Sequence, residues 1–332
     1  MAISSVKGYP QADPTQNTSA NTHFELPEAL LDVYSLDILH NAQGIMRFED
    51  FAIRKQELNG APGENIKFTI YNDISRGGSL NEGVSLSSKS MSADQKTITI
   101  QEWGNAIKVS EKLLRLSWDD VMAESATLLG RDYAVVRDLA LRDALVDDIT
   151  NQKFAYADAN SIPTQVSEIT TADVLDVEAI RNAVEVLETN NAPKFYGDYY
   201  VCFVHPHQAA YLRRDTDWIN AHQYVGTRNI FNGEIGRWED VIFVTSTHAR
   251  NGAATAGTPG YDADLIAAAG TNPAVYEALM FGDQCLYIAD SLPVELRDNG
   301  VEDFGRTHGL AWYSLFGVKM LQDQYAVSIL SA

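Results

Sequence analysis

The sequence contains few cysteines, and it lacks both a long apolar run and the apolar stretch of a secretory signal. Only Cys202 and Cys285 occur among its 332 residues, each inside a short apolar segment where a thiol behaves as a small hydrophobic group. This excludes a disulfide framework and favours a reducing compartment. No window approaches the ~18 uninterrupted apolar residues of a membrane-spanning helix. We therefore expect no membrane partner, and a protein that stays in the cytoplasm unless it leaves as part of a particle.

Basic residues are also scarce, since 25 Lys and Arg stand against 45 Asp and Glu, a net charge of −20. Such a surface repels nucleic acid phosphates and anionic membranes, so a role near DNA would be containment without binding. Apolar residues make up 45% of the chain, enough for a sizeable core. Because single cores stop growing near ~250–300 residues, we expect one large domain with extensions or two intertwined lobes.

Two segments with period-two alternation predict a long hairpin. Apolar residues alternate with polar ones around Ile66–Ile70 and around Ile98, and a polar stretch rich in glycine lies between them. A two-stranded ribbon is marginal in water and needs a surface to lie on. We expect an arm whose apolar side chains dock on another molecule; the alternative is a floppy insertion. The predicted contact residues are Ile66, Phe68, Ile70, Arg76, Gly77, Gly78, Glu82, Lys89, Ile98 and Ile100.

A helix of about 32 residues is predicted after this hairpin, over residues 118–149. Ser117 followed by Asp119 and Asp120 has the form of a capping box, and apolar residues then recur at three- and four-residue steps. Asp138 and Arg142 are spaced for an ion pair on the opposite face. Such a helix would be ~48 Å long, and we expect it to serve as a strut.

The remainder alternates helices and strands, which predicts a mixed α+β fold. Asp176 is placed to cap one helix, and Pro206 stands where a proline opens another. Short helices are expected over residues 26–51. The polar segment before them, residues 1–24, cannot order itself, and it is either a frayed terminus or an arm that orders on a neighbouring copy. The predicted strands are residues 199–204, 241–245, 274–289, 310–318 and 325–330.

One histidine motif is a candidate metal site. His205 and His207 flank Pro206, and Asp215 follows, so a metal-dependent hydrolase is one alternative. However, the proline breaks the strand geometry that would place both rings on one face, and a helix start explains the motif better. No phosphate loop, dinucleotide-binding turn or nucleophile elbow occurs in the sequence. We therefore expect no enzymatic activity, no catalytic residue, and no metal or other cofactor.

A second contact surface is predicted just beyond this motif. Adjacent opposite charges beside a tryptophan are typical of interface centres. The alternative is a surface patch that touches nothing. The residues concerned are Arg213, Arg214, Asp215 and Trp218.

The order of these elements resembles the major capsid proteins of tailed bacteriophages, which have the Hong Kong 97-type fold. Local motifs resemble a podophage-like branch of that family. They are Val201-Cys202-Phe203-Val204-His205-Pro206, then Tyr211-Leu212-Arg213, Asp217-Trp218 and Gly233-Glu234-Ile235-Gly236. The motifs cover residues 199–247, and the element order extends the resemblance over most of the chain from about residue 60.

The resemblance implies a division into five parts. These are an N-terminal arm with short helices (1–60), an extended hairpin loop (61–112), a peripheral domain with the spine helix (113–169), a mostly axial domain (170–295), and a C-terminal return to the peripheral domain (296–332).

The resemblance also implies a function. A subunit of this family assembles into the pentamers and hexamers of an icosahedral head that encloses double-stranded DNA, in the virion and, during assembly, in the host cytoplasm. About 60 residues precede the hairpin, fewer than in members that carry their own scaffolding segment, so a separate scaffolding protein and a portal are expected partners. An encapsulin-like nanocompartment shell is the alternative within the same fold.

Overall fold

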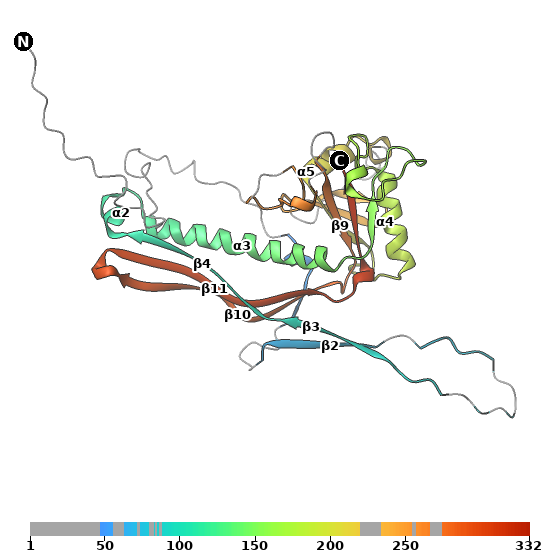
Figure 1. Cartoon of the computed structure of the whole chain (residues 1–332), viewed down its shortest axis with the longest axis horizontal. Helices are drawn as coiled ribbons and strands as arrows, with labels where there is room; N and C mark the ends of the chain where they lie inside the picture. Colours follow the sequence, from blue (N-terminus) through green and yellow to red (C-terminus); the bar gives the residue numbers. More distant parts are fainter. Residues whose placement is uncertain are drawn as a thin grey trace, which may run out of the picture. The chain divides into compact units, whose positions relative to one another are not determined.

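The computed structural model describes residues 47–55, 63–71, 74–79, 83, 85, 88–219, 234–253, 257–265 and 274–332 (Figure 1). The expected N-terminal arm, most of the predicted short helices before residue 51, and the candidate Glu82 lie outside the described residues. The described chain divides into two compact units. Unit 1 contains residues 105–129 and 296–312, and unit 2 contains the other described residues.

Unit 2 is built on a six-stranded sheet in which β6 and β8 are parallel neighbours. All five residues of β6 are buried, because both faces of the sheet are covered, and this explains the continuous apolar run in its sequence. In spatial order the strands are β5 (Gln152–Phe154), β12 (Ala326–Ser331), β9 (Tyr276–Phe281), β6 (Tyr200–Val204), β8 (Val241–Thr245) and β7 (Glu234–Trp238).

Two helices cover one face of this sheet. They are α4 (Val177–Thr189) and α5 (Pro206–Leu212), and their buried residues pack with Cys202 and Phe243. Asp176 caps α4 as predicted, since its carboxylate accepts a hydrogen bond from Ala179 N at 2.8 Å. The α4 stripe of buried residues at three- and four-residue steps is the reason this segment is helical.

The opposite face of the sheet is covered by the long helix α3 (Val121–Asp148) and by the segment that enters unit 2. Leu141 and Leu145 of α3 pack with Phe48, which stacks on Phe203 with ring centroids 4.0 Å apart. The six-stranded sheet is therefore the middle layer of a three-layer core.

A second sheet has four strands and contains the two longest strands of the described chain. Its order is β1 (Ile53–Lys55), β10 (Leu286–Glu302), β11 (Thr307–Met320) and β4 (Gln101–Ser110). The predicted single strand over residues 274–289 is wrong, because the chain turns at Gly282–Cys285 and divides it between β9 and β10. The remaining short 3-10 helices are Glu49–Phe51, Val166–Glu168, Ala263–Leu265, Asp303–Gly305 and Asp323–Tyr325.

Unit 1 has a small core of its own. Val109, Leu113 and Val121 pack together where the end of β4, the short helix α2 (Glu111–Leu116) and the first turn of α3 meet. The predicted capping box is wrong: Ser117 ends α2, and α3 begins at Val121 with Asp120 accepting from Ala123 N. The sequence pattern placed the start of the long helix three residues too early, at residue 118, and did not predict α2.

The predicted hairpin is confirmed as the ribbon of β2 (Asn65–Tyr71) and β3 (Ala93–Thr99) in unit 2. The chain leaves β3 beside β11, where a Cβ built on Gly317 would clash with the backbone oxygen of Thr99. Only a residue without a side chain allows this crossing, so Gly317 fixes where the ribbon joins the four-stranded sheet.

Replacing Gly317 by alanine should destabilise the subunit by about 1–3 kcal/mol, because the new methyl group meets backbone that has to move. Thermal unfolding of the purified subunit measures this. The matched control is Gly130→Ala in α3, where nothing lies within 4 Å of the new Cβ and the exposed helix gains up to ~1 kcal/mol. Equal melting temperatures for the two variants would contradict the steric argument.

Candidate subunit-contact surfaces

The ribbon packs part of its apolar face against its own subunit. Ile66 and Ile98 are directly paired, and both are buried with Ala289 of β10 and Leu321. Phe68 packs with Tyr287 of β10 at 5.5 Å between ring centroids. The expectation that Ile66 and Ile98 dock on another molecule is therefore wrong, because their faces are already covered.

The other ribbon candidates are more accessible. Ile70 and Ile100 are half-buried, while Arg76, Gly77, Gly78 and Lys89 are exposed. The structure brings Lys89 and Arg76 together, since Lys89 Nζ donates to Arg76 O at 3.1 Å. A contact of these residues with another subunit remains a prediction.

Lys89 also sets the geometry of the segment beyond the paired strands. Its ammonium group donates to Ser75 O at 2.6 Å and to Ser75 Oγ at 2.7 Å. In the ladder Tyr71 pairs with Ala93, and four residues further along each arm the same register reaches Ser75 and Lys89. The side-chain tether thus holds the two arms in the ladder's register where strand pairing has ended.

Three large apolar side chains on these arms were missed by the sequence analysis. Tyr71, Ile74 and Met91 are 68%, 56% and 67% exposed. Ile74 and Met91 each stand alone among polar residues, and Tyr71 follows Ile70 on the opposite face of β2, so the apolar alternation marked none of the three. The signal that could have found them is their position at the edge of a segment with too few apolar residues to form a core.

The second predicted surface is mostly internal. Trp218 is only 5% exposed and packs against Phe243, with ring centroids 5.2 Å apart. Asp215 accepts a hydrogen bond from Val177 N at the start of α4. Trp218 is thus a core residue, and Asp215 is engaged within the subunit. Arg213 and Arg214 are exposed, and for them the contact role stays a prediction.

The histidine motif opens α5, as predicted. His205 Nδ1 accepts from His207 N, and Gln208 Oε1 accepts from His205 N, both at 3.2 Å. Burial, with a smaller effect of His207, lowers the pKa of His205 to about 4, so its ring is neutral and suited to accept. Within the described ranges, no group of three His, Cys, Asp or Glu side chains is placed to hold a metal ion.

Buried charges on α3 anchor the segment at which the described chain begins. Arg137 makes a bidentate ion pair with Asp290 of β10 at 3.0 Å and a second pair with Glu49 at 2.9 Å. Burial opposes the charge of Arg137, but the bond to Asp290 and the charge of Glu49 outweigh it and raise its pKa.

The neighbouring Asp138 is fully buried and joins three elements. It accepts from Arg47 N and Phe48 N at 2.8 and 3.0 Å, and it lies 2.5 Å from His248 Nδ1. The predicted pair with Arg142 is wrong, since Arg142 bonds Asp143 and the carbonyl of His248 instead. Sequence spacing indicated a solvated face here, because the partners lie about a hundred residues away in the chain.

The Arg137→Met variant should lose about 3–5 kcal/mol of stability, because Glu49 and Asp290 would keep their charges without a buried partner. Urea unfolding of the isolated subunit measures the difference. The control is Arg181→Met, which removes an exposed pair with Glu239 and should cost less than ~1 kcal/mol. Similar losses in the two variants would refute the anchoring role.

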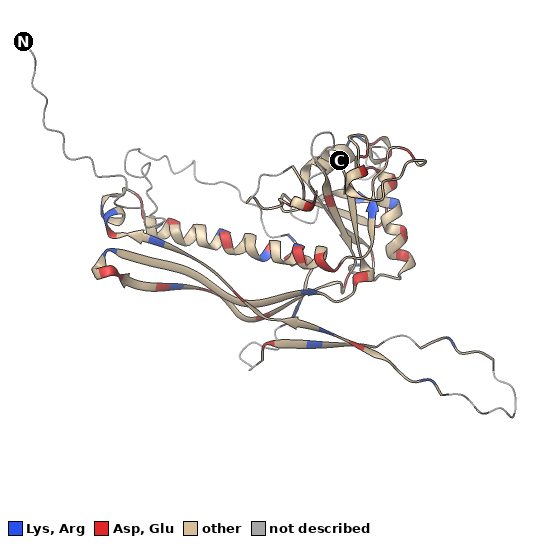
Figure 2. Ribbon diagram, viewed as in Figure 1, with Lys and Arg blue, Asp and Glu red and all other residues tan. Residues whose placement is uncertain are grey.

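In the part of the chain that the structure describes, no helix is long and apolar enough to cross a bilayer. Exposed large apolar side chains occur, among other places, on the distal arms of the ribbon, at the turn that carries Phe304 and around Trp118. Acidic positions are spread along α3, whereas two basic positions lie on the distal arms of the ribbon (Figure 2).

Comparison with known proteins identifies the family to which this chain belongs. A family model described as phage capsid protein matches residues 149–325, which is more than half of the chain. The chain belongs to this phage capsid protein family. It is a major capsid protein and hence a structural component of the virion. No curated protein sequence matches the chain.

Solved phage capsids share the fold over nearly the whole chain. The capsid of Ralstonia phage GP4 is 16% identical, with a TM-score of 0.66 over 95% of this chain and 98% of that one. The capsid of Helicobacter pylori bacteriophage KHP30 is 14% identical, with a TM-score of 0.67 over 94% and 99%. These likenesses confirm the predicted α+β capsid fold; the podophage-like branch and the five-part division stay predictions.

Proposed function

We propose that this protein self-assembles into the pentamers and hexamers of an icosahedral phage head that encloses double-stranded DNA. The observation that carries the proposal is the family match over residues 149–325, within a likeness to phage capsids that spans almost the whole chain. The family match favours a phage head over an encapsulin-like compartment. A structural role, without an enzymatic one, accords with the use of the His205 ring, together with Gln208, as the cap of α5.

The ribbon supports assembly through neighbouring copies. Its base is packed on its own subunit, but Tyr71, Ile74 and Met91 expose apolar surface on its distal arms. A contact in which the arm of one copy meets a different surface of the next is heterologous, and such contacts close into rings when the rotation allows. Rings of five and six subunits are the units from which an icosahedral shell is built.

The net charge suits a container for DNA. A charge of −20 disfavours tight binding of phosphates, so packaged DNA stays free of the inner wall. A subunit that repels its copies needs help to assemble in order, and we infer a separate scaffolding protein and a portal as partners. Assembly would take place in the host cytoplasm, before the protein reaches the finished virion.

Purified protein, expressed with and without its scaffolding partner, should form closed shells or rings of five and six in negative-stain electron microscopy. The expected diameter is uniform in the presence of the scaffolding protein and variable without it. Monomers alone under both conditions, at subunit concentrations up to the limit of solubility, would overturn the proposed assembly.

Deleting residues 77–89 should leave a folded subunit that no longer closes shells. The described residues of this segment contribute nothing to the cores of unit 2, so the melting temperature should stay within about 2 °C of the wild type. Replacing the segment by a Gly/Ser linker of equal length is the control for chain length. A deletion variant that unfolds, or one that still forms shells, would refute the assignment of this arm.

A further inference from the structure

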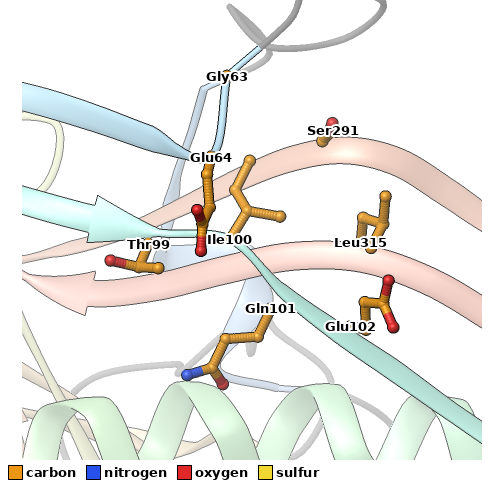
Figure 3. A pocket seen from close by; sticks show the side chains of 8 residues that line it. All are labelled: Gly63, Glu64, Thr99, Ile100, Gln101, Glu102, Ser291 and Leu315. Atoms are coloured by element: carbon orange, nitrogen blue, oxygen red, sulfur yellow. The ribbon is translucent and has the colours of Figure 1, made fainter.

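An acid-lined cleft lies at the base of the ribbon, within unit 2. It has a volume of about 670 Å³ and is open to solvent; Figure 3 shows the side chains that line it. Glu64, just before β2, and Glu102 of β4 line it together with Ile100 and Leu315, and no basic side chain is among its lining residues. Glu102 is fixed in place because Tyr313 OH donates to its carboxylate at 3.1 Å. The cleft therefore presents two carboxylates together with the apolar side chains of Ile100 and Leu315.

The distal end of the same ribbon has the opposite character. Residues 74–92 carry Arg76 and Lys89 against the single acid Glu82, a net charge of 2 − 1 = +1 on a chain whose total is −20. The ammonium group of Lys89 donates its hydrogen bonds to Ser75 and to the carbonyl of Arg76. Within the described residues, the Arg76 guanidinium has no hydrogen bond or ion pair, and Ile74, two residues away, is exposed. The arm thus presents one arginine beside one apolar side chain.

The arm cannot place Arg76 in the cleft of its own chain. Glu64 and Ile100 lie at one end of the β2–β3 ladder, while Ser75 and Lys89 lie beyond the other end. Seven paired residues separate the ends, a ladder of about 23 Å at ~3.3 Å per residue. A partner for Arg76 in such a cleft must belong to another copy.

We propose that Arg76 of one subunit, positioned by Lys89, binds between Glu64 and Glu102 in the cleft of a second copy, with Ile74 against Ile100 and Leu315. Arginine suits this site because its guanidinium carries five N–H donors and can pair with more than one acid, as Arg137 does with Glu49 and Asp290. The contact runs from the tip of one ribbon to the base of the next, so one pairing serves every position in a closed ring. This inference rests on the proposed self-assembly and names the surface that receives the arm.

Charge reversal tests this pairing. Arg76→Glu places like charges together and should lower the fraction of subunits in closed shells about tenfold or more. Adding Glu64→Arg and Glu102→Gln to it should restore most of the yield, because the pair is rebuilt with opposite polarity and the new amide keeps an oxygen for Tyr313. The matched control is Lys67→Glu, the same charge change at an exposed position of β2 outside tip and cleft. Shells are counted by sedimentation and negative stain, and melting temperatures verify that each subunit is folded.

The outcomes separate this inference from the function on which it rests. If the wild type forms no shells, both fail. If the wild type assembles and Arg76→Glu assembles as well as Lys67→Glu, or if the combined reversal restores nothing, the pairing alone is refuted. A second test uses Arg76→Cys with Glu64→Cys and a short bis-maleimide crosslinker, since Cys202 and Cys285 are buried. A series of crosslinked bands of up to five or six subunits on a denaturing gel supports the pairing. Assembled shells that give only the monomer band refute it.

Discussion

The packing of unit 2 depends on two adjacent charged residues in the middle of a helix. Arg137 and Asp138 project from α3 into the protein, where each holds a different part of the chain. Arg137 joins the entering segment to β10, and Asp138 joins that segment to the turn around His248. Burying such charges is costly unless every partner is in place, so the helix, the second sheet and the entering segment take up only one arrangement.

That arrangement also determines how the ribbon is supported. Arg137 fixes β10 beside α3 through Asp290, and the residue before it, Ala289, packs against Ile66 and Ile98 of the ribbon. The chain can then leave β3 across Gly317 and continue as β4 in the four-stranded sheet. The ribbon is anchored at its base on its own subunit and exposed at its distal arms, which is the geometry a subunit needs to reach a neighbour without unfolding when alone.

Local signals in the sequence predicted much of this fold. Asp176 and Pro206 mark helix starts because capping chemistry is decided by neighbouring residues, and the alternation around Ile66 and Ile98 is a property of a strand alone. The covering partner of those isoleucines could not be predicted, since Ala289 and Leu321 are about two hundred residues away. The partners of Arg137 and Asp138, roughly a hundred residues away or more in the chain, were hidden for the same reason.

The predictions for other parts of the structure failed, each for a different physical reason. Trp218 beside Arg213 has an interface composition, but a tryptophan buries more area in a core than at a surface, and Phe243 and Trp238 enclose it. The long β10 was only partly predicted because residues 292–300 are largely exposed on both faces, and backbone pairing with β11 needs no alternation. The acidic cleft was invisible in the sequence, because Glu64, Glu102 and Leu315 become neighbours only when two sheets meet.

The ribbon's construction also sets how it bears force. A hairpin pulled at its turn carries tension along two covalent strands in parallel, so the hydrogen bonds of the β2–β3 ladder remain unloaded. The load passes to the base of the ribbon. There Ile66 and Ile98 are buried beside Leu321, and the backbone of Thr99 crosses Gly317. In a wall stretched by internal pressure, the first element to yield would be this apolar attachment, and the arm itself would remain intact.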